Sequence, residues 1–260
     1  MINIIRVELK RLAHSKLFYI TIAVSLLINY CICLSGTDYY DFDINGSLGL
    51  FSGLYGVIGA PMTAMLIGED FSCGTIRNKL IYGNTRTEVY ITETIVCSLA
   101  GIFIRTLMFA ETFLYLYLKN IHIAADAGEM AKVITVCYIA VMVYTALLVM
   151  AAMLICEKTS TVIWSELMMI LLMLSSGFVL DKKYDDKWQD NKAVLLLNSI
   201  LPYSQTADMI GEESFEGGSE GSKILFSADE NAVGTIIGGS ITVMLTTAAG
   251  AYFFRKKILK

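Results

Sequence analysis

Charged side chains that could contact another molecule are concentrated in one segment, Glu69–Glu88, which lies between two long apolar stretches. Its sequence, EDFSCGTIRNKLIYGNTRTE, combines acids and bases with a helix-like apolar pattern. A short connection between two membrane spans does not require a basic insert of this kind. We therefore expect the segment to form a contact surface for another molecule in the cytoplasm.

The residues of this segment predict a short helix from Gly74 to Tyr82. Ser72 or Asp70 is expected to cap its start, because short polar side chains accept hydrogen bonds from the first backbone N–H groups. Gly83 is expected to end it, since glycine readily adopts the left-handed conformation that closes helices.

Two interpretations of this helix remain open. Ile76, Leu80 and Ile81 lie near one face, whereas Arg77 and Lys79 lie elsewhere. Apolar side chains flanked by bases suit a groove on another protein. An amphipathic helix that rests on the lipid surface would show a similar pattern.

Three further charges lie inside predicted membrane spans, namely Arg105, Glu111 and Glu166. Each costs at least about 2.5 kcal/mol at the bilayer centre, so we expect these side chains to face protein or water. The spacing of Arg105 and Glu111 does not place them on one helix face. Arg105 and Glu166 could form a pair that staples two helices together. Alternatively, Glu111 or Glu166 could contact a cationic substrate.

The motifs for ATP binding by a P-loop and for zinc-dependent proteolysis are absent. The sequence contains no G-x-x-x-x-G-K-[ST] and no HExxH. The only histidines, His14 and His122, lie outside the predicted spans, and the six cysteines form no C-x-x-C pair. Cysteines of this kind are expected to pack as small side chains. We therefore predict no catalytic residue, no metal and no cofactor in this chain.

Membrane helices must position these residues. Of 260 residues, 55% are hydrophobic and 17% are charged, which is typical of proteins that cross a membrane several times. A spanning helix needs roughly 20 mostly apolar residues. Six stretches qualify: 17–34, 48–68, 91–118, 133–155, 160–180 and 232–254. The predicted fold is an all-α polytopic membrane protein with six transmembrane helices. Thr85 and Glu88 form a capping-box pattern before the third stretch.

The distribution of Lys and Arg predicts the orientation. Bases gather at both ends of the chain and in the second loop, whereas the first loop, SGTDYYDFDING, has three Asp and no base. Because bases are enriched on the cytoplasmic side, both termini are expected inside, which agrees with an even number of spans.

The predicted organisation is an amphipathic helix over residues 1–15 followed by a transmembrane domain over 16–260. The first helix places Ile2, Ile5, Leu9 and Leu12 at helical spacing. Within the domain, 69–90 is the cytoplasmic loop and 181–231 an extracellular loop. The latter contains an apolar helix expected to end near Pro202, then a flexible GEESFEGGSEGS stretch.

The arrangement E-(D)-x-x-x-G-T-I-R-N-K-L-x-x-G-x-x-R around Gly74–Arg86 resembles the cytoplasmic loop of ABC-2 type permeases. These are the membrane subunits of ABC exporters whose ATPase is often a separate chain. The segment VELKRLAHSKLFYI is similar to their elbow helix and first span, and LLLNSILPYS to their outer segment before the last span.

The resemblance implies a function and partners. Residues 1–15 would be the elbow helix, and 74–82 the coupling helix that contacts the ATPase. The coupling residues would be Gly74, Thr75, Arg77, Asn78, Leu80, Ile81 and Arg86. Mg-ATP would bind the partner ATPase, a second permease copy would complete the complex, and no nucleic acid is expected. Similar compact permeases of the bacterial plasma membrane export bacteriocins, lantibiotics or amphipathic peptides such as phenol-soluble modulins.

Two alternatives remain, a secondary transporter and a membrane accessory protein involved in immunity or sensing. A secondary transporter should show broken helices at matching positions in two halves. The 48–68 stretch shows Gly/Pro interruption but the 160–180 stretch shows no counterpart, which argues against this class. The accessory class requires no binding site and stays open.

Overall fold

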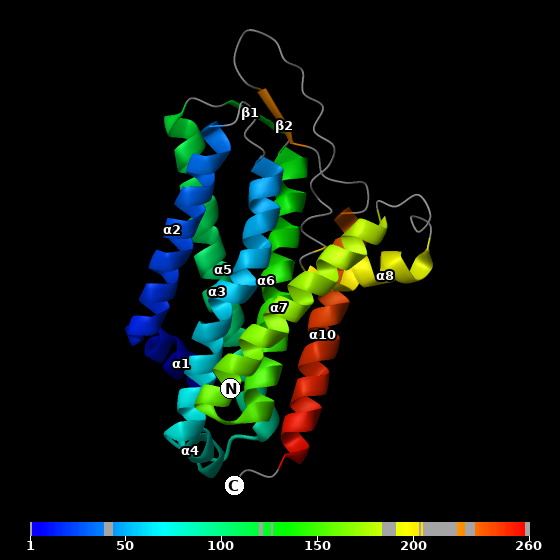
Figure 1. The fold of residues 1–260 in the computed structure, drawn as a ribbon. Helices are drawn as coiled ribbons and strands as arrows, with labels where there is room; N and C mark the ends of the chain where they lie inside the picture. Colours follow the sequence, from blue (N-terminus) through cyan, green and yellow to red (C-terminus); the bar gives the residue numbers. More distant parts are fainter. Residues whose placement is uncertain are drawn as a thin grey trace.

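The computed structural model describes residues 2–38, 44–119, 122–125, 127–183, 191–202, 204, 223–226 and 232–257. These residues form a bundle of long helices (Figure 1). The elements are α1 (Ile2–His14), α2 (Lys16–Asp38), α3 (Ile44–Ser72), α4 (Thr75–Ile81), α5 (Arg86–Leu118), β1 (His122–Ala125), α6 (Ala127–Ile155), α7 (Lys158–Lys183), α8 (Lys192–Ile200), β2 (Lys223–Phe226) and α10 (Ala232–Lys256).

Five helices in the described part of the chain are long and apolar enough to cross a membrane. They cover Lys16–Leu34, Arg86–Leu118, Met130–Ile155, Lys158–Lys182 and Val233–Lys256. These helices support a multi-pass membrane protein and match five of the six predicted spans. The other predicted span, 48–68, lies within the continuous helix α3 but is not among the five.

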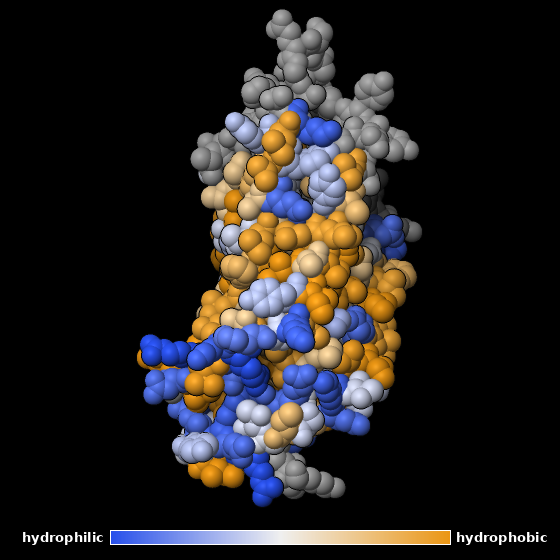
Figure 2. All heavy atoms as spheres, turned by 90° about the vertical axis from the view of Figure 1, so that its left-hand side faces the viewer, coloured by the Kyte–Doolittle hydropathy of each residue, from blue (hydrophilic) through white to orange (hydrophobic). Residues whose placement is uncertain are grey.

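The core of the bundle forms around α5 and α6. α6 packs against α3, α5, α7 and α10. In its most apolar window 61% of the residues are buried, compared with 17% in the windows of α7 and α10. α2 is also largely exposed, and its outer surface joins a broad apolar belt (Figure 2). The outer helices therefore carry the apolar surface that a lipid environment would cover.

The two ends of the bundle differ. α4, the start of α1 and the end of α10 lie at one end, and the strands lie at the other (Figure 1). β1 and β2 pair in parallel, with His122 opposite Lys223 and Ala125 opposite Phe226. This short pair is the exception to an otherwise helical chain across the residues that are described.

The long loop before α10 contains the predicted apolar helix, which is α8. Asn191 begins it, and its side chain accepts a hydrogen bond from the backbone N–H of Ala193 at 3.0 Å. The helix ends before Leu201, whose extended backbone precedes Pro202, as expected for a residue before proline. The GEESFEGGSEGS stretch lies outside the described residues, as do residues 39–43 of the first loop.

The N-terminal helix α1 lies across the α4 end of the bundle (Figure 1). It ends at His14, and Ser15 separates it from α2. Leu12 is buried, and Ile5 and Leu9 pack against the same core cluster. The predicted apolar face thus packs largely on protein, although Ile2 is exposed.

Candidate docking surface and its buried ion network

The helix predicted between Gly74 and Tyr82 is present as α4. Gly74 precedes it with a φ of 67°, and Gly83 follows it with a φ of 90°, both left-handed conformations that favour glycine. The predicted cap was wrong, because no side chain bonds the first turn. Instead, the Ser72 hydroxyl donates to the Glu69 carbonyl at 3.0 Å, and Asp70 forms ion pairs described below.

The residues that share a face of α4 also differ from the prediction. Ile76 and Lys79 are buried, and Leu80 packs half-buried against a core cluster. Ile81 and Tyr82 are 72% and 86% exposed. Ile81 therefore does not share the face of Ile76 and Leu80. The buried positions follow the helical spacing i, i+3, i+4, with a lysine in the middle.

The exposed side of this segment is named here the α4 outer face. It consists of Arg77, Asn78, Ile81 and Tyr82. A groove of about 840 Å³ lies beside it. α3 and α4 line the groove together with Arg86, the α6–α7 turn at Cys156, and Lys257. The α4 outer face therefore combines two large exposed apolar groups, one cation and an adjoining hollow.

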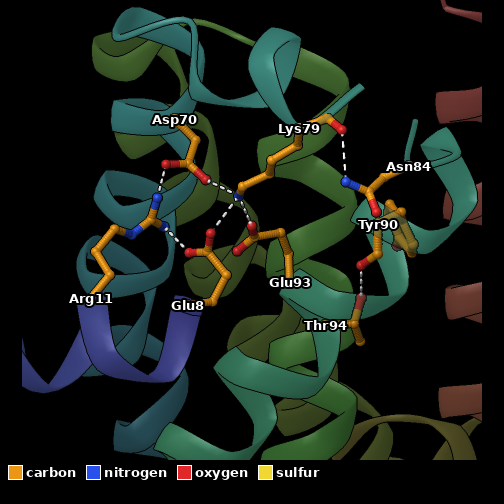
Figure 3. Close-up of polar contacts among 8 residues, drawn as sticks. All are labelled: Glu8, Arg11, Asp70, Lys79, Asn84, Tyr90, Glu93 and Thr94. Carbon is orange, nitrogen blue, oxygen red and sulfur yellow. Dashed lines mark hydrogen bonds and ion pairs between the residues drawn. The ribbon is translucent and has the colours of Figure 1, made fainter. Parts of the chain in front are cut away.

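Lys79 holds α4 onto the bundle from its buried side. Its ammonium group lies 2.8 Å from Glu8, 2.6 Å from Asp70 and 2.6 Å from Glu93 (Figure 3). Arg11 pairs with Glu8 at 2.8 Å and also with Asp70. We name these five residues the ion network; they connect α1, α3, α4 and α5.

Four of the five residues of the ion network are nearly closed to solvent, whereas the side chain of Arg11 is 35% exposed. The side chains of its three acids are 2% exposed, and that of Lys79 is 10% exposed. Oxygens of the three carboxylates lie within 4.8 Å of one another, a spacing that a metal ion could bridge. The ammonium group of Lys79, however, already lies between them and supplies the positive charge. The arrangement is therefore best described as a buried ion cluster that joins four helices.

Further contacts fix both ends of the α4–α5 connection. The Asn84 amide donates to the Lys79 carbonyl at 2.8 Å, which satisfies a free carbonyl near the end of α4. The capping box at Thr85 and Glu88 is confirmed. Arg86 donates to the Arg255 carbonyl at 3.2 Å and to the Lys257 carbonyl. Arg86 therefore binds the C-terminal end of α10.

α5 and α10 approach closely at the same end of the bundle. A Cβ atom built on Gly250 would overlap the Tyr90 hydroxyl oxygen. The Tyr90 ring also lies 6.3 Å from that of Phe254. A side chain at Gly250 would require the Tyr90 ring or the two helices to shift. The glycine is therefore needed for the contact that holds α10 beside α5.

The three charges predicted inside the membrane do not form one site. Arg105 is fully buried in α5, over the Phe109 ring at 4.6 Å and 3.5 Å from the Cys137 sulfur. Glu111 accepts a hydrogen bond from the Asn29 amide of α2 at 2.7 Å. Glu166 is half-buried on α7, and no ion pair joins it to Arg105 among the described residues.

Three residues of the ion network, Glu8, Arg11 and Glu93, were not singled out from the sequence. Glu8 has a local signal, since it lies three residues before Arg11 and therefore on the same face of α1. Glu93 also has one, because it lies early in the apolar stretch after the capping box, where a carboxylate is costly without a partner. Neither signal identifies Lys79 as the shared partner.

Comparison with known proteins does not assign the chain to a family: no protein-family model and no curated sequence matches it.

Proposed function

We propose that this protein is the membrane subunit of an ABC exporter and belongs to the ABC-2 permease type. In this proposal, a separate ATPase binds the α4 outer face and hydrolyses Mg-ATP. The membrane helices then move an amphipathic peptide, or another hydrophobic or antimicrobial compound, out of a bacterial cell. The chain itself contributes transport and coupling, without catalysis.

One observation carries the proposal, namely that α4 has a rigid buried side and an unpartnered outer side. Lys79 fixes it to three other helices, whereas Ile81 and Tyr82 face outward. A force applied by a partner to the α4 outer face would reach α1, α3 and α5 through the ion network. That is the mechanical requirement for a coupling helix, and a helix resting loosely on lipid would not need it.

The proposal includes a topology with α3 as the sixth span and both termini in the cytoplasm. α3 has 29 residues and packs against α2, α6 and α7, which supports its passage through the same layer as its neighbours. In this arrangement α1 is the elbow helix at the cytoplasmic surface, and α8 lies at the outer surface.

The proposed assembly contains a second copy of the permease. α7 exposes Leu167, Leu171 and Leu174, and an apolar groove of about 780 Å³ runs between α6 and α7. An exposed apolar surface of this kind can be covered by a second copy of the protein or by lipid.

Glu111 and Glu166 remain the proposed contacts for a cationic substrate, because the side chain of each is only half-buried.

The test is a double substitution on the α4 outer face, Ile81→Ser with Tyr82→Ser. The variant should fold normally, because both side chains are exposed. Its binding to the proposed ATPase partner should fall at least about tenfold, since buried aromatic and aliphatic anchors dominate interface energies. Mild-detergent co-purification and substrate-stimulated ATP hydrolysis measure the effect.

The matched control is Tyr117→Ser with Leu118→Ser at the opposite end of α5, where both side chains are also exposed. This control should retain ATPase binding. Equal binding by both double variants would contradict the proposal. If no ATPase accompanies the wild-type chain even after cross-linking, an accessory membrane protein becomes the better assignment.

A further inference from the structure

A third groove lies at the corner where α1 turns into α2. Its volume is about 740 Å³, and α3 forms its floor with Met65 and Leu66. α1 lines it with residues at the spacing i, i+3, i+4 and i+7, which is one helical face. These residues are Val7, Lys10, Arg11 and His14. From α2, Lys16, Leu17 and Ile20 complete the wall.

The mouth of this groove carries uncompensated positive charge. Of the charged groups that line it, Arg11 belongs to the ion network, and Glu69 pairs with Lys158 at 2.9 Å. This leaves the ammonium groups of Lys10 and Lys16, neither of which pairs with a carboxylate in the described part of the chain. Both side chains are exposed, so they can close on an anion.

The wall next to these lysines is apolar and exposed. Val7 is 63% and Ile20 is 60% exposed. On this side of the molecule, the apolar belt gives way to the hydrophilic α4 end (Figure 2). A groove at such a boundary is basic on the side of the headgroups and apolar on the side of the acyl chains.

We propose that this groove is a binding site for an anionic phospholipid. The lipid phosphate lies between Lys10 and Lys16, with His14 beside it, and one acyl chain follows Leu17 and Ile20. A free phosphate would use only the basic half of the groove, whereas a lipid uses both halves. The site requires that the chain lies in a membrane, and it does not rest on an ATPase partner.

The test measures lipid retained by the full-length protein. Protein purified in dodecyl maltoside is mixed with dioleoyl phosphatidylglycerol or, as a neutral reference, dioleoyl phosphatidylcholine, and native mass spectrometry counts bound lipids. The wild type should retain one phosphatidylglycerol per chain in preference to phosphatidylcholine. Lys10→Gln with Lys16→Gln should weaken phosphatidylglycerol binding by about ten- to thirtyfold, because each base near a membrane contributes substantially to anionic lipid binding.

A matched control removes the same charge elsewhere. Arg6 and Arg77 are exposed and do not line the groove. The variant Arg6→Gln with Arg77→Gln should keep its phosphatidylglycerol, and Lys10→Arg with Lys16→Arg should keep most of it. Equal losses in the two glutamine variants would overturn the proposal in favour of a diffuse surface charge.

Soluble anions distinguish the two sources of phosphate. Inorganic phosphate and glycerol phosphate at millimolar concentration should not displace the bound lipid, and Ile20→Asn should weaken lipid binding. Displacement by inorganic phosphate would overturn the lipid assignment. Unchanged gel-filtration and circular dichroism profiles verify that each variant is folded.

Discussion

The ammonium group of Lys79 is buried between carboxylates of α1, α3 and α5, with a neighbouring cation at Arg11. Buried charges are tolerated only when their partners stay in place, since one partner left alone in a low-dielectric interior is costly. The ion network therefore behaves as a unit. It restricts where α4 can lie relative to the membrane helices.

Lys79→Met should lower the free energy of unfolding by about 3–5 kcal/mol, because it leaves three buried carboxylates with one cation. Thermal unfolding in detergent, followed by circular dichroism, measures this change. Adding Glu93→Gln should recover part of the loss, since it removes one of the uncompensated charges.

Lys158→Met serves as the control for this substitution. Lys158 pairs with Glu69 at 2.9 Å, but their side chains are 39% and 55% exposed. A surface pair of this kind contributes about 1 kcal/mol or less. If both methionine variants unfold at the same temperature, the ion network does not stabilise the α4 end.

At the scale of the helices, close contacts near α4 set the arrangement of α5 and α10. Gly250 lets the Tyr90 hydroxyl approach the α10 backbone, and Arg86 binds carbonyls at the end of α10. Arg86 also lines the groove beside the α4 outer face, and Tyr90 lies in the same core cluster as Ile76 of α4. A displacement of α10 would therefore change the surface proposed to meet the ATPase.

Gly250→Ala should destabilise the protein by about 1–3 kcal/mol, because the new methyl group would overlap the Tyr90 hydroxyl. Gly234→Ala in the same helix has open space around its added methyl and should be neutral or slightly stabilising. Tyr90→Phe in the Gly250→Ala background should recover part of the loss. Thermal unfolding of the wild type and these three variants measures the effects. Equal destabilisation by alanine at both glycines would contradict a specific contact between Gly250 and Tyr90.

For the molecule as a whole, the proposed orientation depends on which end faces the cytoplasm. α4 lies at the same end as the start of α1 and the end of α10 (Figure 1). The six cysteines are all free, and Cys73, just before α4, is exposed. Labelling of the native cysteines can therefore test on which side of the membrane this end of the bundle lies, and no new residues need to be introduced.

Cys73 should react with a membrane-impermeant maleimide only after cells are permeabilised, because the proposed topology places α4 inside. Cys156 at the α6–α7 turn should react more slowly, since burial raises the pKa of its thiol and lowers the thiolate fraction. Its rate should rise as the pH increases. Mass spectrometry of labelled peptides measures both, and a Cys73→Ser variant is the control. Labelling of Cys73 in intact cells would reverse the orientation.

The sequence predicts much of the fold because the relevant signals are local. Apolar stretches identify the long helices, and Thr85 with Glu88 marks the start of α5. The role of Lys79 could not be predicted in this way. A seven-residue helix has too little pattern to show which side is buried, and the partners of Lys79 come from distant helices. Asp70 was likewise interpreted as a local cap, whereas it pairs with Arg11 across the fold.

The ion network also has a consequence for the order in which the protein is made. Glu8 leaves the ribosome early, but its partner Lys79 and the neighbouring Glu93 follow only after α2 and α3. Until then, the carboxylate of Glu8 is more stable in water than in the bundle. We therefore expect α1 to pack against the bundle only after the start of α5 has been made, later than its place in the chain alone would suggest.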